Sequence, residues 1–362
     1  MPASFDMLRK GRGAAISPGN RYAHGQREAA DDGWRPLGPD VDEPPPLRTT
    51  VTIQPARSII SRNNSPDIGF RQSINPYQGC EHGCIYCYAR PSHAYLDLSP
   101  GLDFESRLFA KPNAAELLRA ELSNPRYQPQ TIVIGANTDP YQPIERDWQI
   151  TRQLLEVMRE FRHPVGIITK SATIERDIDI LADLARDNLV HAAVSITTLD
   201  RNLHRVMEPR AAAPQRRIEV VRNLAEAGIP VSVMTAPIIP ALNDRDMERI
   251  LELSAAAGAK GAGYVLLRLP LELKELFRDW LARHFPDRAG HVMSLVRQMR
   301  GGRDYDADFA TRHTGTGPFA ALIAQRFRAA CERLGLNCDW KPLSTSRFRR
   351  TASNPQLGLF DG

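Results

Sequence analysis

Three cysteines lie close together in the sequence, at Cys80, Cys84 and Cys87, with the spacing C-x3-C-x2-C. Two glycines in the same stretch allow the backbone to turn tightly, so that the three thiolates can converge. Three thiolates from one loop suit a cubane iron–sulfur cluster, in which three irons take protein ligands and the fourth stays open. A structural zinc site normally takes a fourth ligand, and no second C-x2-C or H-x3-H pair follows. We therefore predict an iron–sulfur site, with a zinc site completed by His82 or His93 as the alternative.

This spacing, with the aromatic residue Tyr86 just before the last cysteine, resembles the signature of the radical S-adenosylmethionine (radical SAM) superfamily. In that superfamily a [4Fe-4S] cluster binds SAM at its open iron. One electron from an external donor then cleaves SAM to a 5′-deoxyadenosyl radical, which abstracts a hydrogen atom from the substrate. The resemblance implies a radical SAM enzyme in which Cys80, Cys84 and Cys87 hold the cluster.

The composition describes a globular protein without a membrane segment. The 362 residues are 42% hydrophobic and 25% charged, and no apolar run approaches the length of a membrane-spanning helix. The first residues lack the apolar core of a secretory signal. Five cysteines, three of them needed as thiolates, favour the reducing cytoplasm over a disulfide framework. A net charge of +5 and a pI of about 9.0 are compatible with a polyanionic partner.

A repeated strand–helix rhythm follows the cysteines and predicts an α/β fold. The predicted strands are residues 70–74, 131–135, 165–169, 191–197, 231–236 and 263–269. Helices are expected at residues 113–122, 151–161, 174–186, 214–227 and 244–257 between them. Six such units favour a parallel barrel and fall short of the eight of a closed one. The resemblance implies a partial (β/α)6 barrel with its chemistry at the carboxyl ends of the strands.

Composition also divides the chain into four parts. Residues 1–50 are rich in Gly, Pro, Arg and Asp, and we expect a mostly disordered extension that can drape over the domain. Residues 51–270 form the predicted barrel. Residues 271–342 are predicted to form a C-terminal helical extension, with helices at 273–285, 289–299 and 319–334. We expect these helices to cover the open side of the barrel. Residues 343–362 form a basic, flexible tail.

The segment 135–143, Gly-Ala-Asn-Thr-Asp-Pro-Tyr-Gln-Pro, sharpens the resemblance. With Cys87-Tyr88 and the later strands, it is similar to the spore photoproduct lyase branch of the superfamily, whose enzymes repair a thymine dimer in DNA. The similarity covers about residues 70–269. It implies the SAM contacts Tyr86 beside the adenine, Thr138 after the second strand, Lys170 after the third, Ser195 in the fourth and Ala236 at the end of the fifth.

Each of these assignments has a structural alternative. The Lys170 cation could pair with the SAM carboxylate, whereas the hydroxyls of Thr138 and Ser195 could instead satisfy backbone groups. Arg210, in Glu208-Pro209-Arg210 after the fourth strand, could bind SAM or a substrate phosphate, or form a surface salt bridge. The acidic residues Asp139, Glu145 and Asp147 either orient a substrate or are solvated loop charges.

One departure from the lyase pattern affects the predicted reaction. The lyase returns a hydrogen atom to its product from a cysteine near the end of the second strand, and that position is Ala136 here. Its partner tyrosine is present as Tyr88, which we expect to be catalytic. Either another donor such as Cys331 or Cys338 serves, or the reaction differs. The resemblance to the lyase still implies a nucleic-acid substrate such as damaged DNA, with an RNA, protein or metabolite substrate as the alternative.

The C-terminal tail carries a second motif. Gln356-Leu357-Gly358-Leu359-Phe360 resembles the Q-L-x-L-F peptide by which bacterial replication and repair proteins dock to the sliding clamp. A leucine and an aromatic residue on a flexible tail make a short anchor for a hydrophobic groove. The match is short, so the tail could instead pack on the barrel. A third hypothesis for the whole chain is a non-catalytic iron–sulfur or zinc protein that binds the clamp.

Overall fold

The core of the fold is a seven-stranded sheet with the order β10-β9-β8-β7-β6-β3-β2. The computed structural model describes residues 9–22, 47–339 and 341–350. The strands are β2 (Ser61–Arg62), β3 (Gln72–Ile74), β6 (Ile132–Ile134), β7 (Val165–Thr169), β8 (Val190–Ser195), β9 (Val231–Ile238) and β10 (Gly261–Leu266). All neighbours are parallel except β2 and β3. Within the described chain, the two edge strands β10 and β2 do not pair with each other, so the barrel stays open. The predicted partial (β/α)6 barrel is therefore confirmed.

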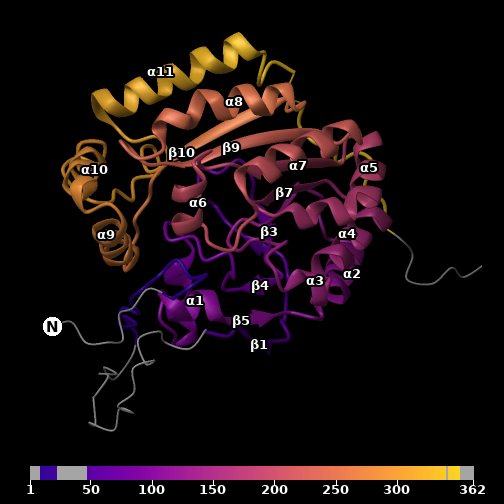
Figure 1. Ribbon diagram of the computed structural model, residues 1–362. Coiled ribbons are helices and arrows are strands. Elements are labelled where there is room, and N and C mark those ends of the chain that lie inside the picture. The colour runs from indigo at the N-terminus through magenta and orange to yellow at the C-terminus, as the bar shows by residue number, and fades with distance from the viewer. Residues whose placement is uncertain (1–8, 23–46, 340, 351–362) are drawn as a thin grey trace, which may run out of the picture.

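Five main helices pack outside the sheet (Figure 1). They are α2 (Ala114–Ser123), α4 (Ile150–Glu160), α5 (Ile178–Arg186), α7 (Pro214–Glu226) and α8 (Met247–Ala256). On α4 the residues Leu154, Leu155 and Met158 are fully buried, as their helical spacing predicts. Helix α7 begins at a proline and is followed by Gly228, whose φ of 77° suits the end of a helix. Apolar periodicity and these end signals therefore account for the outer layer.

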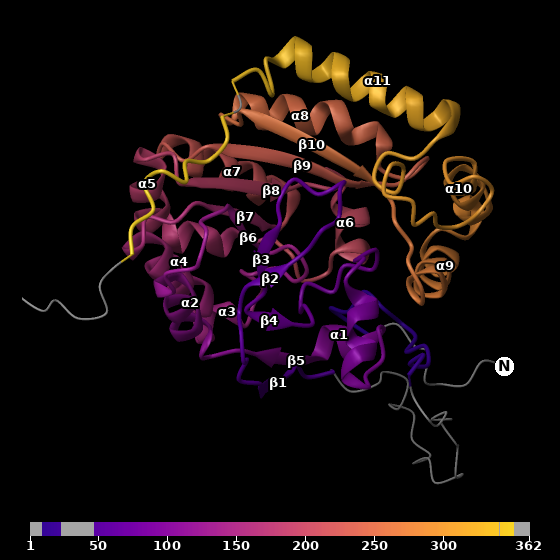
Figure 2. The ribbon, with the colours of Figure 1, turned by 180° about the vertical axis from the view of Figure 1, so that it is seen from behind.

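The connections contain short elements that the sequence did not predict. A second sheet has the order β1-β5-β4, formed by β1 (Thr50–Ile53), β5 (Arg107–Ala110) and β4 (Tyr77–Gln78). Further short helices are η1 (Arg90–Leu96), α1 (Leu102–Ser106), α3 (Glu145–Trp148) and α6 (Arg201–Met207). Two more, η2 (Ala172–Asp177) and η3 (Asp244–Asp246), form the first turns of the helices predicted at residues 174–186 and 244–257. Strand β4 leads directly into Gly79 and Cys80, so this small sheet positions the cysteines (Figure 2).

The C-terminal helices lie on one side of the barrel. Helix α11 (Gly317–Leu334) packs on α8, and its Phe327 ring lies 4.8 Å from that of Tyr264 on β10. Helices α9 (Leu273–His284) and α10 (Pro286–Gln298) lie near α6, to whose Val206 carbonyl Trp280 donates at 3.0 Å. Figures 1 and 2 show α11 outside α8, and α9 and α10 at the end of the sheet beside α6.

The gap between β10 and the β2–β3 hairpin is spanned by the segment between α10 and α11. The Leu266 N–H donates to the His313 carbonyl at 2.8 Å, which attaches this segment to β10. On the other side of the gap, Arg312 donates to Asp67 at 2.7 Å. The connecting segment, more than the helices themselves, therefore joins the two edges of the barrel.

Part of the extension predicted to be mostly disordered is packed against the barrel. The N–H groups of Gly13 and Ala14 each donate to the buried Glu105 carboxylate at 2.9 Å. A side chain at Gly13 would place its Cβ 1.9 Å from the Gly83 carbonyl oxygen, so only glycine fits this approach. The segment 9–22 thus contacts the cysteine loop through Gly13, which packs against Gly83.

The chain end that the structure describes, residues 341–350, is also packed. The Ser344 N–H donates to Asn188 and the Arg349 N–H to Phe161. The Phe348 ring lies 6.4 Å from that of Phe161 and 5.6 Å from that of His163. These partners immediately precede β7 and β8, so this segment runs along the amino-terminal ends of the strands. The Gln356–Phe360 peptide lies outside the described residues.

The buried His163 predicts acid-dependent stability. Burial lowers the pKa of His163 to about 4, against about 6.5 in an unfolded chain. Below pH 6.5 the unfolded chain binds a proton that the folded chain excludes, so the free energy of unfolding falls as the pH falls towards 4. Urea unfolding should show that His163→Gln removes about 3 kcal/mol of this pH dependence. The exposed His291→Gln is the control, and an equal effect of both variants would contradict the assignment.

No helix in the described ranges combines the length and the apolar composition of a membrane-spanning segment.

Candidate active site

The cysteine loop, residues 79–88, lies beyond the carboxyl end of β3. The Cys80 and Cys84 thiols are buried, and Cys87 is half-buried. Burial, Asp139 and the two other cysteines raise the pKa of Cys80. Burial and the Glu208 carboxylate raise the pKa of Cys84 to about 12, against the influence of the Lys170 cation. The three thiols therefore share one site, and bound cations would favour their thiolate forms.

The arrangement of these thiols fits a cluster better than a single zinc ion. In the described part of the chain, no three His, Cys, Asp or Glu side chains are gathered to hold one metal ion. In a cubane, each thiolate binds a different iron, so the sulfur atoms need only face a common space. His82 Nδ1 lies 3.3 Å from Asp139, and His93 Nε2 lies 2.9 Å from the Arg107 carbonyl. One ring nitrogen of each candidate fourth ligand of a zinc ion thus has another partner.

Side chains from outside the loop hold its backbone in place. The Gln142 amide donates to the Gly79 carbonyl at 3.1 Å and accepts from the Glu81 N–H at 2.9 Å. The buried Arg90 donates to the carbonyls of Gly83 and Cys84 at 3.0 and 2.9 Å. These contacts satisfy backbone groups that would otherwise be buried without partners, so the loop is preorganised.

The segment after α6 also binds the loop. The Met207 carbonyl accepts from the Ile85 N–H at 3.1 Å, and the Arg210 N–H donates to the His82 carbonyl at 3.3 Å. The Arg210 side chain is partly exposed and forms an ion pair of 2.9 Å with Glu81. Arg210, proposed from the sequence as a ligand contact, is therefore engaged with the cysteine loop itself.

Tyr86 faces a buried carboxylate in the interior of the barrel. Its hydroxyl donates to Glu208, which also accepts from Thr197 at 2.7 Å and from Arg217 at 2.5 Å. Burial opposes ionisation of Glu208, but Arg217, Lys170 and His204 together lower its pKa to about 2. Burial, with the nearby negative groups, raises the pKa of Tyr86, so this phenol stays neutral. The network fixes the ring of Tyr86 relative to the cysteines.

The other predicted SAM contacts have different surroundings. Lys170 Nζ lies 5.8 Å from the Tyr86 ring centroid. Ser195, at the end of β8, is buried, and its carbonyl accepts from Arg217 at 2.9 Å. The Ala236 carbonyl accepts from Thr197 at 3.2 Å. The structure therefore brings Tyr86, Lys170, Ser195 and Ala236 to the region around the Glu208 network. The Thr138 hydroxyl instead donates to the Tyr77 carbonyl at 2.9 Å.

Tyr88 occupies the edge of the site. Its side chain is 47% exposed, and its hydroxyl donates to the Ala136 carbonyl. The guanidinium carbon of Arg268 lies 5.2 Å from the ring centroid. Tyr88 therefore contacts Ala136, the residue that we predict from the sequence to stand where the lyase has its cysteine. Cys331 and Cys338 lie elsewhere, because Asn337 binds Lys260 and Ala262 at the opposite, amino-terminal end of β10.

Two of the three acidic residues after β6, Asp139 and Glu145, have structural contacts, whereas Asp147 is exposed. Asp139 accepts from the Thr169 hydroxyl and from the Lys170 N–H, each at 2.7 Å. Although burial opposes it, the neighbouring His82 and these hydrogen bonds lower the pKa of Asp139 to about 2. Asp139 thus ties the end of β7 to the cysteine loop and is not a solvated loop charge.

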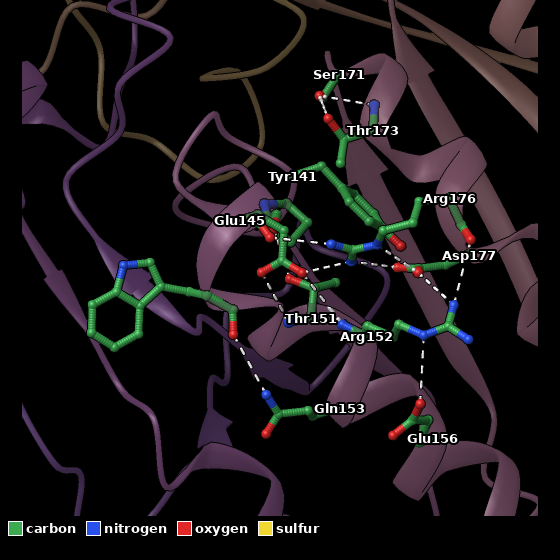
Figure 3. A network of polar contacts seen from close by, with 12 residues as sticks. Tyr141, Glu145, Thr151, Arg152, Gln153, Glu156, Ser171, Thr173, Arg176 and Asp177 are labelled. Atoms are coloured by element: carbon green, nitrogen blue, oxygen red, sulfur yellow. Dashed lines mark hydrogen bonds and ion pairs between the residues drawn. The ribbon is translucent and has the colours of Figure 1, made fainter.

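Glu145 is fully buried in a second ion-pair network (Figure 3). Its carboxylate accepts from Arg176 at 2.7 Å, from the Thr151 N–H at 3.1 Å and from the Tyr77 hydroxyl. Arg176 also pairs with the buried Asp177 at 2.8 Å. Because Tyr77 lies on β4, this network supports the strand that leads into the cysteines.

Sequence reasoning missed Gln142, Arg90, Arg217 and Arg268. A signal existed for Arg217, because it lies on the same helical face as the buried Val221 and Leu224. A charged residue on such a face predicts a buried partner. The partners of the other three are distant in the sequence or are backbone atoms, and no local pattern indicates them.

Comparisons with known proteins agree with this geometry. Residues 74–254 match the family model described as the Radical SAM superfamily. An uncharacterized protein of Mycobacterium tuberculosis is 36% identical over 237 residues, which cover 65% of this chain and 70% of that protein. The radical SAM Nα-GlyT isomerase of Pseudomonas phage M6 is 27% identical over 186 residues, covering 51% of this chain and 36% of the isomerase.

Solved structures of spore photoproduct lyase share the fold. The lyase complexed with dinucleoside spore photoproduct has a TM-score of 0.52 and 14% identity, covering 79% of this chain and 80% of that chain. A lyase variant with bound AdoMet and the dinucleoside has the same TM-score of 0.52 and the same coverage.

Proposed function

Because this chain belongs to the radical SAM superfamily, we propose that Cys80, Cys84 and Cys87 hold the [4Fe-4S] cluster that its enzymes use together with SAM. When bound, the two cofactors supply a carbon-centred radical that abstracts a hydrogen atom from the substrate. The three thiols in one preorganised loop support this assignment. The thiolates also favour a cytoplasmic location.

The SAM site that we propose lies between the cysteine loop and the ends of β7, β8 and β9. Lys170 supplies a cation for the SAM carboxylate, and Tyr86 supplies an aromatic face beside the adenine. Ser195 and Ala236 line the proposed SAM site at the ends of β8 and β9. Thr138 acts through β4 and Arg210 acts through the cysteine loop, because the Thr138 hydroxyl binds the Tyr77 carbonyl and the Arg210 guanidinium binds Glu81.

The proposed substrate is a nucleic acid, and the surroundings of Tyr88 carry this proposal. The buried Arg268 Nε has no hydrogen-bond partner among the residues that the structure describes, and Arg268 Nη1 lies 3.4 Å from His313 Nε2. Arg312 and His313 share one carboxylate, Asp67. A guanidinium whose Nε has no partner, over a half-exposed aromatic ring, suits a phosphate and a base. The lyase of similar fold is solved with a dinucleoside, which supports the same class.

The reaction that we propose is not the repair chemistry of the lyase. Ala136 lacks the weak S–H bond from which a cysteine returns a hydrogen atom to a substrate radical, and Cys331 and Cys338 lie at the other end of β10. The Tyr88 hydroxyl is the group beside Ala136 that carries a transferable hydrogen atom. We therefore assign Tyr88 to hydrogen transfer at the substrate.

Anaerobic reconstitution of the protein with iron and sulfide tests both the proposed enzyme class and the proposed substrate class. We expect about four irons per chain and release of 5′-deoxyadenosine from SAM that depends on dithionite. Single-stranded DNA, duplex DNA and RNA are then added separately, and one of them should increase this release. Stoichiometric zinc without SAM cleavage would contradict the enzyme assignment. SAM cleavage with no affinity for any nucleic acid would contradict only the substrate class and favour a protein or metabolite.

The variant Arg268→Gln should weaken nucleic-acid binding. Losing one charged hydrogen bond costs about 1.5–3 kcal/mol, or roughly ten- to a hundredfold in Kd, as measured by fluorescence anisotropy. SAM cleavage without substrate should persist, because Arg268 contacts Tyr88 and not the cysteines. Arg119→Gln, on the outer helix α2, is the matched control. Equal affinities of wild type and Arg268→Gln would exclude Arg268 from the substrate site.

We further propose that Gln356–Phe360 binds the bacterial sliding clamp. The described residues 341–350, which precede this peptide in the sequence, run along the amino-terminal ends of the strands, whereas Tyr88 lies at their carboxyl ends. Replacing both Leu357 and Phe360 with alanine in the full chain should weaken clamp binding by at least about 2 kcal/mol. Asn354→Ala is the control, and binding that survives the double substitution would end this part of the proposal.

A further inference from the structure

A cavity of about 230 Å³ lies between α6, the turn after β9 and the junction of α9 and α10. It is outside the proposed cofactor and substrate sites. Its apolar lining is formed by Leu203, Val206, Leu242 and Phe285. Arg205, Arg245 and Arg288 line it as well, together with His284. An apolar centre with a polar rim is the composition of a protein-docking surface.

The lining of this cavity carries more positive than negative charge. Asp200 is the carboxylate in the lining, and it lies 3.5 Å from Arg245. Arg205 and Arg288 are exposed and form no ion pair with any residue in the described ranges. Burial, together with the nearby Arg283, lowers the pKa of His284, so it is neutral at pH 7. Arg245 is balanced by Asp200 and by Asp246, which lies 3.9 Å from it. The exposed Arg205 and Arg288 would attract an acidic partner and accelerate its association.

The cavity is also close to the cysteine loop in the fold. Helix α6 contributes Leu203, Arg205 and Val206 to the lining and ends at Met207. The Met207 carbonyl accepts the Ile85 N–H of the cysteine loop at 3.1 Å. Leu203 belongs to the same buried apolar cluster as Cys84 and Ile85. A partner seated on α6 would therefore be separated from the cluster ligands by about one helix diameter, roughly 10 Å.

We propose that this cavity and its arginines dock an acidic electron-transfer protein that reduces the enzyme. The inference rests on the proposed function, because only a cluster at the cysteine loop requires electrons there. One electron leaves the donor and arrives at the cluster, so the donor is oxidised by one electron and the cluster is reduced by one. Electron transfer through protein weakens steeply with distance, which favours a donor site near Cys84.

A donor protein fits this surface better than a nucleic acid does. Nucleic-acid strands bind in basic grooves that follow the backbone and carry aromatic stacking residues, whereas this cavity is small with a mainly aliphatic floor. Electron-transfer complexes bury small areas and rely on charge for fast, transient association. Docking at α6 would also leave Tyr88 and Arg268 free for the substrate.

The test uses the full chain and an acidic flavodoxin as the probe. The variant carries Arg205→Glu and Arg288→Glu, and the control carries the same charge changes at the distant, exposed Arg119 and Arg186. Binding of oxidised flavodoxin, followed by its flavin fluorescence, should weaken at least tenfold in the variant and remain unchanged in the control. Wild-type binding should also weaken as salt is raised, because the attraction is screened. This readout needs neither SAM nor turnover.

Activity with two reductants then separates docking from chemistry. Deoxyadenosine formation driven by photoreduced flavodoxin should fall in the variant, whereas formation driven by dithionite should stay at the wild-type level. Three outcomes would overturn the proposal: the wild type does not bind flavodoxin, the wild type and the variant bind it equally, or the variant loses the same share of deoxyadenosine formation with both reductants. So would a loss of DNA affinity without a loss of flavodoxin binding. No deoxyadenosine from the wild type with dithionite would instead refute the proposed function.

Discussion

Replacing Cys84 with alanine is expected to abolish deoxyadenosine formation and to remove most of the iron. A cubane bound at three irons needs all three thiolates, because the fourth iron is left for the cofactor. The Cys84 thiol is buried among apolar side chains and beside Glu208, so water is a poor substitute ligand there. Iron and sulfide content after anaerobic reconstitution, followed by chromatographic measurement of deoxyadenosine, gives both readouts.

Cys338→Ala is the matched control for this experiment. Cys338 is exposed near the amino-terminal end of β10, so its loss should leave both the iron content and SAM cleavage at wild-type levels. Full iron content and SAM cleavage in Cys84→Ala would mean that the cluster is held elsewhere. Loss of iron in Cys338→Ala would point to a different set of ligands.

Replacing Arg217 with methionine is expected to cost about 3–5 kcal/mol of unfolding free energy. The Arg217 and Glu208 side chains are each 1% exposed. Methionine keeps most of the apolar volume but leaves Glu208 charged and buried without its cation. It also removes the donors to the carbonyls of Ser195 and Ala212. Urea unfolding at pH 7 measures the loss.

The exposed pair Arg119–Glu160 provides the comparison, because its side chains are 49% and 34% exposed. Arg119→Met should cost no more than about 1 kcal/mol. Combining Glu208→Gln with Arg217→Met should cost less than the sum of the two single changes, since the double variant leaves no unpaired charge. A loss below 1 kcal/mol in Arg217→Met would show that water or another cation compensates Glu208.

The regular part of the fold could be predicted from the sequence for a local reason. Short runs of β-branched residues predicted the parallel strands. Apolar residues at helical spacing, such as Leu154, Leu155 and Met158, predicted the outer helices. Both patterns arise from backbone geometry within one element, so they are visible without any knowledge of its neighbours. The small sheet β1-β5-β4 was missed because its strands are two to four residues long, and β1 is largely exposed.

Packing of the terminal segments could not be predicted for a different reason. Residues 9–22 lack a periodic apolar pattern, and they are held by the Glu105 carboxylate and by the close approach of Gly13 to Gly83. Residues 341–350 are held by backbone hydrogen bonds and by the Phe348 ring among aromatic residues. Composition indicated disorder in the first case and flexibility in the second, because the binding surfaces belong to other parts of the chain.

The sequence alone determined the identity of the chemical groups. The spacing of Cys80, Cys84 and Cys87 places three thiols in one short loop, and six strand–helix units place that loop at the carboxyl edge of a partial barrel. The absence of a cysteine at position 136 is likewise a fact of the sequence. These features depend on residue type and on separations of a few residues, so the chain carries them before it folds.

Only the tertiary structure decided what surrounds those groups. Tyr86 reaches Glu208 across 122 residues of sequence, and Arg268 reaches Tyr88 from a different edge of the sheet. The structure turned Thr138 towards β4 and Arg210 towards the cysteine loop, and it placed Asp139 beside His82 and the buried Glu145 beside Arg176. Such contacts depend on how separate elements pack, and burial then makes charge pairing obligatory. No local pattern encodes that pairing, which is why the supporting side chains of the site became visible only in the fold.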